Sequence, residues 1–386
     1  MNSSELIIKN CRLYNKASKG KPADIVISNG RIKSVGKAAG RTAVKNVIDA
    51  EGRTAAPGFI DVHIQGAGGA DVLDNTPEAL ITISKTLASV GTTSYLGTTV
   101  VKPGDGNSHL KLMKKFAYKN IGGAVLLGIH LEGPFINIKK KGGLAPEAIY
   151  APTQEGLSEI FKATGSALKM MTIAPEIPGC LEIIKKLVKR GVVASFAHSD
   201  ANYEETVKGF QAGINHVTHI FNAMPPLHHR EPGPLAAIFE SKNVSVQIIS
   251  DGHHLHPSIV NLVYRLVGGD RCICITDGMH GIGLPDGIYK YNGRRYESKK
   301  GAARYLDGTL IGSTMSLGNI AFQFMKFTGC SMETAINSVT KNPAKLLGIY
   351  DKKGSLDPGK DADIVILNED HSVYLTIING EVVYKK

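Results

Sequence analysis

Between residues 58 and 276, eight short apolar runs alternate with longer segments that show helical hydrophobic periodicity. Amphipathic stretches such as 77–90 and 180–190 separate the runs, a pattern typical of βα units. Eight such units that close on themselves predict an α/β fold, a (β/α)8 TIM-like barrel. The runs are 58–62, 92–96, 124–131, 168–173, 192–197, 214–218, 244–250 and 271–276.

Both ends of the chain have the pattern of β hairpins. Residues 24–35 hold two β-rich runs around Asn29-Gly30, and the segment 362–384 repeats this arrangement with a turn at Asn379-Gly380. An Asn-Gly pair favours the tight type I′ turn. Neither terminal segment can bury a core alone, so we expect the two to pack together as one small β-sandwich domain. The predicted domains are 1–56 and 346–386 for the small β domain and 57–345 for the barrel.

The formal net charge of +11 could indicate nucleic acid, an anionic surface or an acidic small substrate. Lysines are scattered, and clusters such as 139–141 are not interleaved with aromatic residues. Because no nucleic-acid motif accompanies them, we predict a solvated basic surface and no nucleic-acid partner. An anionic small substrate is compatible with this charge.

The cellular location is predicted from the chain start and the cysteines. Residues 1–9 lack a basic segment followed by a long apolar run, and no window approaches the length of a membrane span. Five scattered cysteines cannot all pair, and Cys272 and Cys274 alternate along an apolar run, on one face of a strand. We therefore expect reduced thiols, a cytoplasmic location and no membrane partner.

The residues just past the eight runs form one set, because a (β/α)8 barrel has its active site at the carboxyl ends of its strands. Almost every run ends in a potential metal ligand or acid–base group, which independent chance explains poorly. The set comprises His63, Gly97-Thr98, Glu132, Glu176, His198, His219, Asp251 with His253 and His254, and Asp277.

Part of this set suits a catalytic metal. Glu132, His198 and His219 offer one carboxylate and two imidazoles, and a catalytic zinc site typically uses three such ligands and leaves a position open for water. Water bound to zinc becomes a nucleophile near neutral pH. Asp277 could take a proton from that water, although its Asp-Gly pair is by itself more typical of a turn.

Six motifs, in order along the chain, resemble signatures of the N-acetylglucosamine-6-phosphate deacetylase family of the amidohydrolase superfamily. The resemblance spans essentially the whole chain, and the ordered set is more specific than any one motif. The segments 57–61 (PGFID) and 356–364 (LDPGKDADI) are common to the superfamily. The motifs are 130–135 (HLEGPF), 197–201 (AHSDA), 218–225 (THIFNAMP), 229–233 (HREPG), 251–254 (DGHH) and 275–278 (ITDG).

The resemblance implies roles for residues near the reacting bond. Glu132, His198 and His219 match the family's metal ligands, and Asp277 matches its catalytic acid–base. His254 matches a substrate-binding histidine near the scissile amide, where it could polarise the carbonyl or stabilise the oxyanion. The implied reaction converts N-acetyl-D-glucosamine 6-phosphate to D-glucosamine 6-phosphate and acetate, in amino-sugar catabolism or cell-wall recycling.

The resemblance also implies how the phosphosugar is held. Asn222, Ala223 and Arg230 match positions that bind the sugar phosphate, and in the family this arginine reaches into the neighbouring subunit's site. The implied active unit is a homodimer. A guanidinium and backbone amides suit a phosphate because they offer fixed donors to several oxygens. Further substrate contacts, mostly through backbone, are implied for Gly143, Leu310, Ile311 and Gly312.

Two positions depart from the family pattern. Members often carry His or Gln at the position of Leu144, so one polar contact near the sugar is expected to be missing or supplied elsewhere. At the first strand, members with His-x-His bind two metals and members with Gln and Asn bind one, whereas this chain has His63 and Gln65. Alternate residues of a strand share a face, but an amide is a poor zinc ligand. We expect one tightly held zinc ion per subunit, with His63 either supporting the ligands from outside the metal or acting as a weak ligand of a second ion that binds only at high metal.

Two alternatives stay open. A related amidohydrolase that acts on another acylated amino sugar, a cyclic amide or a dipeptide would share the fold and the metal chemistry, which alone do not determine the substrate. Many such relatives use a carboxylated lysine as metal bridge, a role that Glu132 would fill here. A catalytically inactive scaffold homologue should have lost metal ligands, yet the three expected ligands and Asp277 are all present.

Overall fold

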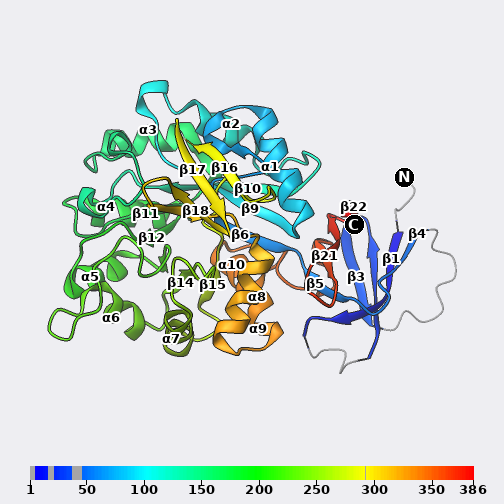
Figure 1. Cartoon of the computed structure of the whole chain (residues 1–386). Coiled ribbons are helices and arrows are strands. Elements are labelled where there is room, and N and C mark those ends of the chain that lie inside the picture. The colour runs from blue at the N-terminus through cyan, green and yellow to red at the C-terminus, as the bar shows by residue number, and fades with distance from the viewer. Residues whose placement is uncertain (1–4, 16–20, 37–45, 292) are drawn as a thin grey trace.

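A parallel sheet of eight strands forms the centre of the computed structural model, which describes residues 5–15, 21–36, 46–291 and 293–386 (Figure 1). Each strand coincides with one of the eight predicted apolar runs, and the predicted barrel is confirmed. The single bridge between Ile64 and Gly278 brings the last unit back to the first. In sheet order the strands are β15 (Cys272–Cys274), β14 (Ser245–Ile248), β13 (His216–Val217), β12 (Val193–Phe196), β11 (Leu168–Ile173), β10 (Val125–Glu132), β9 (Thr92–Thr99) and β6 (Phe59–Ile64).

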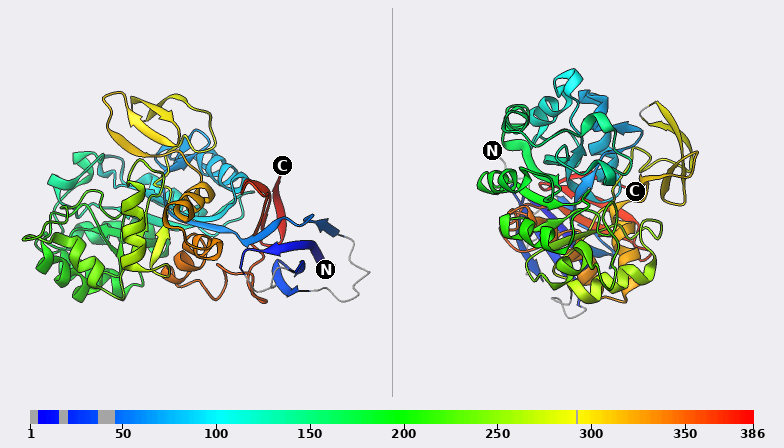
Figure 2. Two further views of the ribbon diagram at one scale, coloured as in Figure 1. Left: turned by 60° about the horizontal axis from the view of Figure 1, so that its bottom comes forward. Right: turned by 90° about the vertical axis from the view of Figure 1, so that its left-hand side faces the viewer.

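Helices surround this sheet on its outer side (Figures 1 and 2). The helix α1 shows why the sequence starts a helix where it does: Thr76 accepts a hydrogen bond from the Ala79 amide, and Pro77 occupies the first turn. Both predicted helical stretches are present, as α1 and α4. The helices are α1 (Pro77–Ser89), α2 (Ser108–Phe116), α3 (Gln154–Thr164), α4 (Cys180–Lys189), α5 (Tyr203–Ala212), α6 (Gly233–Glu240), α7 (Pro257–Val267), α8 (Leu317–Thr328), α9 (Met332–Ser338) and α10 (Lys341–Leu346).

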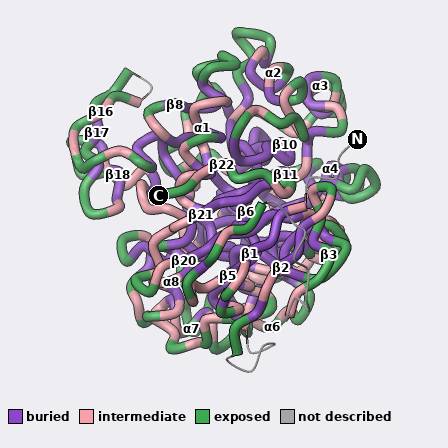
Figure 3. The backbone as a smooth tube through the Cα atoms, turned by 90° about the vertical axis from the view of Figure 1, so that its right-hand side faces the viewer, coloured by how far each residue is buried: buried purple, intermediate pink, exposed green. Residues whose placement is uncertain are grey.

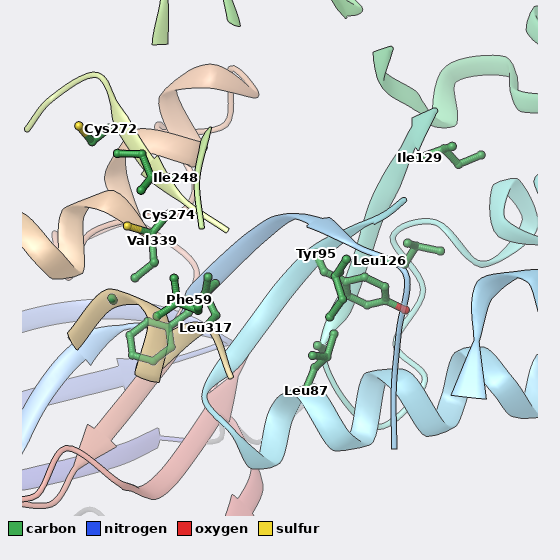
Figure 4. Close-up of a cluster of buried hydrophobic side chains, with 14 of the residues drawn as sticks. Phe59, Leu87, Tyr95, Leu126, Ile129, Ile248, Cys272, Cys274, Leu317 and Val339 are labelled. Atoms are coloured by element: carbon green, nitrogen blue, oxygen red, sulfur yellow. The ribbon is translucent and has the colours of Figure 1, made fainter. Parts of the chain in front are cut away.

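The core lies between the barrel strands and their helices, where the backbone is almost wholly buried (Figure 3). In Figure 4, Leu87 of α1 lies beside Tyr95 of β9, whose hydroxyl is 3.1 Å from the Ser84 hydroxyl oxygen. Cys272 and Cys274 are buried in the same region, and all five cysteines are free thiols, as predicted. Among the described helices, none combines the length and the apolar composition needed to cross a bilayer.

A second eight-stranded sheet joins the two ends of the chain, as predicted (Figure 1). Both predicted Asn-Gly turns have positive φ at each residue, 51° and 74° at Asn29 and Gly30 and 49° and 79° at Asn379 and Gly380, as a type I′ turn requires. The predicted domain boundaries stay a prediction. The strands are β1 (Glu5–Leu13), β2 (Ala23–Ser28), β3 (Arg31–Gly36), β4 (Asn46–Asp49), β5 (Thr54–Pro57), β20 (Ile364–Leu367), β21 (Val373–Ile378) and β22 (Glu381–Lys385).

Two small antiparallel sheets were not foreseen from the sequence. One follows the last barrel strand and projects from the barrel (Figure 2), and the other is a short hairpin after β6. The projecting sheet has its own cluster of packed side chains, which includes Met279, Tyr296 and Tyr305. Its strands are β16 (Gly287–Tyr291), β17 (Arg294–Lys299), β18 (Ala302–Tyr305) and β19 (Leu310–Ser313), and the hairpin consists of β7 (Gly66–Ala67) and β8 (Ala70–Asp71).

A buried ion cluster connects the terminal sheet to the barrel. The Lys353 ammonium pairs with the carboxylates of Asp363 and Asp361. Asp363 also accepts a hydrogen bond from the Asn379 amide, and its carbonyl accepts one from Gly58 at the entry to the first barrel strand. Burial disfavours the ammonium form of Lys353, but the two carboxylates outweigh this effect and raise its pKa.

We predict that Lys353→Ala destabilises the protein by about 3–5 kcal/mol, because it leaves the Asp363 carboxylate buried without its partner. The urea midpoint of unfolding, followed by circular dichroism, should fall accordingly. Lys352→Ala is the matched control, since Lys352 is exposed and such a change usually costs at most about 0.5 kcal/mol. Equal midpoints for the two variants would contradict this role of the ion cluster.

Candidate active site

Three predicted metal ligands meet at the carboxyl ends of three barrel strands. Glu132 is the last residue of β10, while His198 and His219 each lie two residues past the ends of β12 and β13. Glu132 Oε1 is 3.1 Å from His198 Nε2 and 3.0 Å from His219 Nε2, and the two Nε2 atoms are 3.2 Å apart. All three residues are buried. The three ligand atoms can therefore share one metal ion.

The backbone at these strand ends is in an unusual conformation. His198, His219 and Asp277 have φ values of 49°, 28° and 48°, in the left-handed region that residues other than glycine rarely adopt. Such a conformation costs roughly 1–3 kcal/mol per residue and tends to occur at functional sites. Here it occurs just past the end of each strand, at the residue whose side chain enters the site.

Hydrogen bonds to the backbone orient the ligands. His198 Nδ1 lies 2.7 Å from the carbonyl oxygen of Lys140, in the 3-10 turn Ile138–Lys140. Because that nitrogen carries the proton that it donates to the carbonyl, Nε2 is the ring atom left to face Glu132 or a metal ion. The peptide of His198 is fixed as well, since its carbonyl oxygen accepts a hydrogen bond from the Asn137 amide.

The charges in this cluster suit a divalent cation. Burial favours the neutral form of Glu132, but the charge of His63 and hydrogen bonds from His198 and His219 outweigh it and hold the pKa of Glu132 well below its usual range. Burial lowers the pKa of His219 more than Glu132 raises it. An ionised carboxylate and a neutral imidazole are the forms in which these side chains bind a metal. The residues present therefore fit a divalent ion.

His63 lies beneath the three predicted ligands and faces two carboxylates, those of Asp277 and Glu132. Its Nε2 is 3.1 Å from Asp277 Oδ1 and 3.8 Å from Glu132 Oε2, while its Nδ1 is 3.0 Å from Gln247 Oε1. Although burial disfavours the imidazolium, the two carboxylates raise the pKa of His63 to about 9. Gln65 lines the cavity above, where its Oε1 accepts a hydrogen bond from the Tyr291 hydroxyl.

Asp277 and His254 face each other across the site. His254 Nε2 is 3.7 Å from Asp277 Oδ2, and His254 Nδ1 is 2.7 Å from Asp251 Oδ2. Asp251 also accepts hydrogen bonds from the amides of His253 and His254, which fixes the imidazole through a carboxylate contact. Burial raises the pKa of Asp277, but His63 outweighs it, so that the net pKa is lowered and the carboxylate form is favoured.

A cavity of about 280 Å³ opens over these groups. Most predicted substrate-binding residues line it, but two do not. Gly312 is buried behind the wall, and Arg230 is exposed outside the cavity, with its guanidinium 2.7 Å from His229 Nε2. The residues predicted from the sequence that line the cavity are Thr98, Glu132, Gly143, Leu144, His198, His219, Asn222, Ala223, His254, Asp277, Leu310 and Ile311.

Two strand-end residues of the predicted set lie elsewhere. The Glu176 carboxylate accepts hydrogen bonds from the Asn137 amide group, the Ser199 hydroxyl and the Asp200 backbone amide, so it holds two loops together. His253 is exposed and its ring nitrogen lies near the carbonyl of Lys300.

Sequence reasoning also missed residues that shape the site. Gln247, which holds His63, had a usable signal, since it is a polar residue inside the apolar run 244–250. Tyr291 and Tyr305 line the cavity from the projecting sheet, whose position no pattern in the sequence indicates. Asp71 comes from the short hairpin after β6 and also lines the cavity.

Comparisons with known proteins identify the family of this chain. Residues 54–383 match the amidohydrolase family. An N-acetylglucosamine-6-phosphate deacetylase of Bacillus subtilis is 37% identical over 329 residues, 84% of this chain and 83% of that protein. An N-acetylgalactosamine-6-phosphate deacetylase of Escherichia coli O157:H7 is 33% identical over 83% of this chain and 85% of that protein.

Solved structures are similar over nearly the whole chain. N-acetylglucosamine-6-phosphate deacetylase of Thermotoga maritima is 34% identical with a TM-score of 0.86 and covers 99% of this chain and 100% of its own. The Mycobacterium smegmatis enzyme, solved as an aspartate-to-alanine variant with N-acetyl-D-glucosamine-6-phosphate, is 28% identical with a TM-score of 0.90 and the same coverage.

Proposed function

The chain belongs to the amidohydrolase family, and within it we propose that this enzyme hydrolyses the acetamide of N-acetyl-D-glucosamine 6-phosphate to D-glucosamine 6-phosphate and acetate, in amino-sugar metabolism. The observation that carries the proposal is the juxtaposition of Glu132, His198 and His219 with Asp277 and His254 at the base of one cavity. Relatives with this activity match the chain over more than four-fifths of its length. A cavity of about 280 Å³ suits a monosaccharide phosphate.

The alternatives have weaker support. An enamidase and a Xaa-Pro dipeptidase share the fold at 19% and 16% identity, a level that says nothing about the substrate. An inactive scaffold would have no reason to keep strained backbone at three acid–base and ligand positions. The galactosamine epimer of the substrate is the alternative favoured by a specific observation, because one relative acts on it.

We infer that one zinc ion per subunit is held by Glu132, His198 and His219, since one carboxylate and two imidazoles are typical zinc ligands. When bound, such an ion lowers the pKa of water and polarises a carbonyl oxygen. His63 presents Nε2 to Glu132 and Asp277 and would serve as a weak ligand of a second ion. Its strand neighbour Gln65 offers only an amide, and that amide oxygen already accepts a hydrogen bond from Tyr291.

Asp277 is proposed to move the proton during hydrolysis. Its lowered pKa favours the carboxylate, which can accept a proton from the attacking water. The protonated carboxyl then delivers that proton to the departing sugar amine. His63 at 3.1 Å from Oδ1 orients the carboxylate, which leaves Oδ2 on the side of His254.

His254 is proposed to stabilise the negative charge that develops on the acetyl oxygen. Its Nδ1 is held by Asp251 at 2.7 Å, and a doubly protonated ring donates from Nε2. Because Asp251 makes three hydrogen bonds to this segment, the imidazole is already oriented before the substrate binds.

The phosphate site and the oligomer are proposed together. Asn222 and Ala223 line the cavity, whereas Arg230 lies outside the cavity of its own chain. An exposed guanidinium on the same loop region supports a homodimer in which Arg230 binds the phosphate in the neighbouring subunit. A cytoplasmic location is also proposed, since all five thiols are free.

The first test is acetate release from N-acetylglucosamine 6-phosphate, N-acetylgalactosamine 6-phosphate and N-acetylglucosamine. We expect kcat/KM to favour the first over the unphosphorylated sugar by roughly 10²- to 10⁴-fold, because charge-assisted hydrogen bonds contribute about 1.5–3 kcal/mol each. Arg230→Ala should raise KM for phosphorylated sugars alone, with the exposed Arg265→Ala as control. If none of the three sugars releases acetate, the proposed reaction is refuted. If Arg230→Ala impairs the phosphorylated and the unphosphorylated sugars equally, the Arg230 assignment is refuted.

Asp277→Asn should lower kcat by about 10²- to 10⁴-fold, the usual contribution of a general acid–base. The variant should keep its metal, since Asp277 is not among the three proposed ligands. Stopped assays and elemental analysis of the same preparation measure both effects, and Asp270→Asn, at an exposed position, is the control. Substantial retained activity would show that another group moves the proton.

The metal count tests the single-ion proposal. Dialysed, fully active protein should contain one equivalent of zinc, and a chelator should abolish activity until one equivalent is restored. His198→Ala removes a proposed ligand and should weaken zinc binding. The loss of affinity should exceed the roughly 10- to 100-fold that follows the removal of a residue that only orients a ligand. His253→Ala, at an exposed histidine, should change nothing. Two stoichiometric ions in active wild-type protein would overturn the single-ion proposal.

A further inference from the structure

Asp71 is a carboxylate of the cavity wall that the proposed reaction does not use. Of the three described carboxylates that line the cavity, Glu132 and Asp277 serve the chemistry and Asp71 has no assigned role. It ends the short hairpin that directly follows Gln65, and the hairpin is fixed by hydrogen bonds from the amides of Gly68 and Gly69 to the carbonyls of Ile282 and His280.

The two oxygens of this carboxylate have different surroundings. Asp71 Oδ1 accepts a hydrogen bond of 2.8 Å from the Leu73 amide, and the Asp71 amide donates to the Asp74 carboxylate at 2.8 Å, so the side chain has one fixed orientation. Asp71 is 5% exposed, and its Oδ2 has no hydrogen-bond partner among the described residues. Native proteins rarely leave a buried carboxylate oxygen without a donor.

The surroundings favour a donor that arrives with a ligand. Burial raises the pKa of Asp71 to about 7, which indicates a poorly solvated site where a hydrogen bond is strong. Asp71 also lines a smaller neighbouring cavity of about 130 Å³, with Lys102 and Lys290 on its wall. A water molecule in that cavity is therefore the rival partner of Oδ2.

The chemistry of the substrate limits which group can reach this oxygen. In a 2-acetamido sugar 6-phosphate, the acetamide at C2 is held at the metal ligands and the phosphate at C6 is held elsewhere. The edge of the ring between these anchors carries the hydroxyls at C3 and C4. Hydroxyl groups are the donors that this edge offers, and a carboxylate oxygen is a strong acceptor.

We propose that Asp71 Oδ2 accepts a hydrogen bond from the 3- or 4-hydroxyl of the pyranose and thereby selects among amino-sugar phosphates. This inference rests on the proposed function and makes Asp71 a specificity-determining residue. A site built to bind a hydroxyl rejects an analogue that lacks it, because the buried acceptor is then left unpaired. The contact exists before and during the reaction, so its loss should appear mainly in KM.

The test compares wild-type enzyme with Asp71→Asn on N-acetylglucosamine 6-phosphate and on its 3-deoxy and 4-deoxy analogues. The asparagine keeps an oxygen for the Leu73 amide and replaces the free oxygen by an NH₂ group. We expect kcat/KM on the natural substrate to fall by roughly 10- to 100-fold. One deoxy analogue should show a similar loss with wild-type enzyme and no further loss with the variant, since both changes remove the same hydrogen bond.

The outcomes separate this inference from the proposed function. If Asp71→Asn lowers kcat/KM equally on all three sugars, or on none of them, the hydroxyl contact is overturned. A water molecule in the neighbouring cavity is then favoured as the partner of Oδ2. Glu78→Gln changes an exposed carboxylate in the first turn of α1, a few residues further along the chain, and should leave all three substrates within about twofold of wild type. If it reproduces the pattern of Asp71→Asn, the effect is not specific to the Asp71 carboxylate and the inference fails. Wild-type enzyme that releases no acetate would refute the proposed function itself, and the inference with it.

Discussion

The ionised, buried carboxylate of Glu132 is the interaction on which the arrangement of the site depends. A lone carboxylate in this position would be costly, because burial removes its hydration. Two imidazoles within 3.1 Å and the charged ring of His63 below compensate for that loss. The same field lowers the pKa of Asp277, so one electrostatic cluster prepares both the metal ligands and the proton acceptor. A cation in this cluster would complete a charge pattern that the protein already holds.

The barrel provides this precision by combining rigid strands with fixed loop contacts. Strand pairing sets the positions of the ends of β10, β12 and β13, and left-handed backbone at His198, His219 and Asp277 turns the side chains inward. Loops then orient the rings, through the Lys140 carbonyl for His198 and the Asp251 carboxylate for His254. Local strain is thus distributed over residues whose neighbours hold them in place.

Much of this could be predicted because barrel strands are encoded locally. Each buried parallel strand is a short apolar run, and the polar residue that ends it is visible in the sequence. Contacts between distant segments were not predictable in this way. Glu176 follows an apolar run as the proposed ligands do but turns toward loops, and Arg230 lies outside the cavity. Asp71 and Tyr291 reach the site only because two small sheets fold back over it, a property of tertiary packing that no local periodicity records.

The projecting sheet enters and leaves the barrel at almost the same point. The Ser313 amide donates to the Asp277 carbonyl, and the Met279 amide donates to the Ser313 carbonyl, so the two ends of the segment are held together at Asp277. The segment between them contributes no strand to the eight-stranded parallel sheet of the barrel. Such a segment can change in length and composition during evolution without altering the barrel strands. Sugar recognition could therefore change through substitutions in this segment while the proposed metal ligands and Asp277 stay the same.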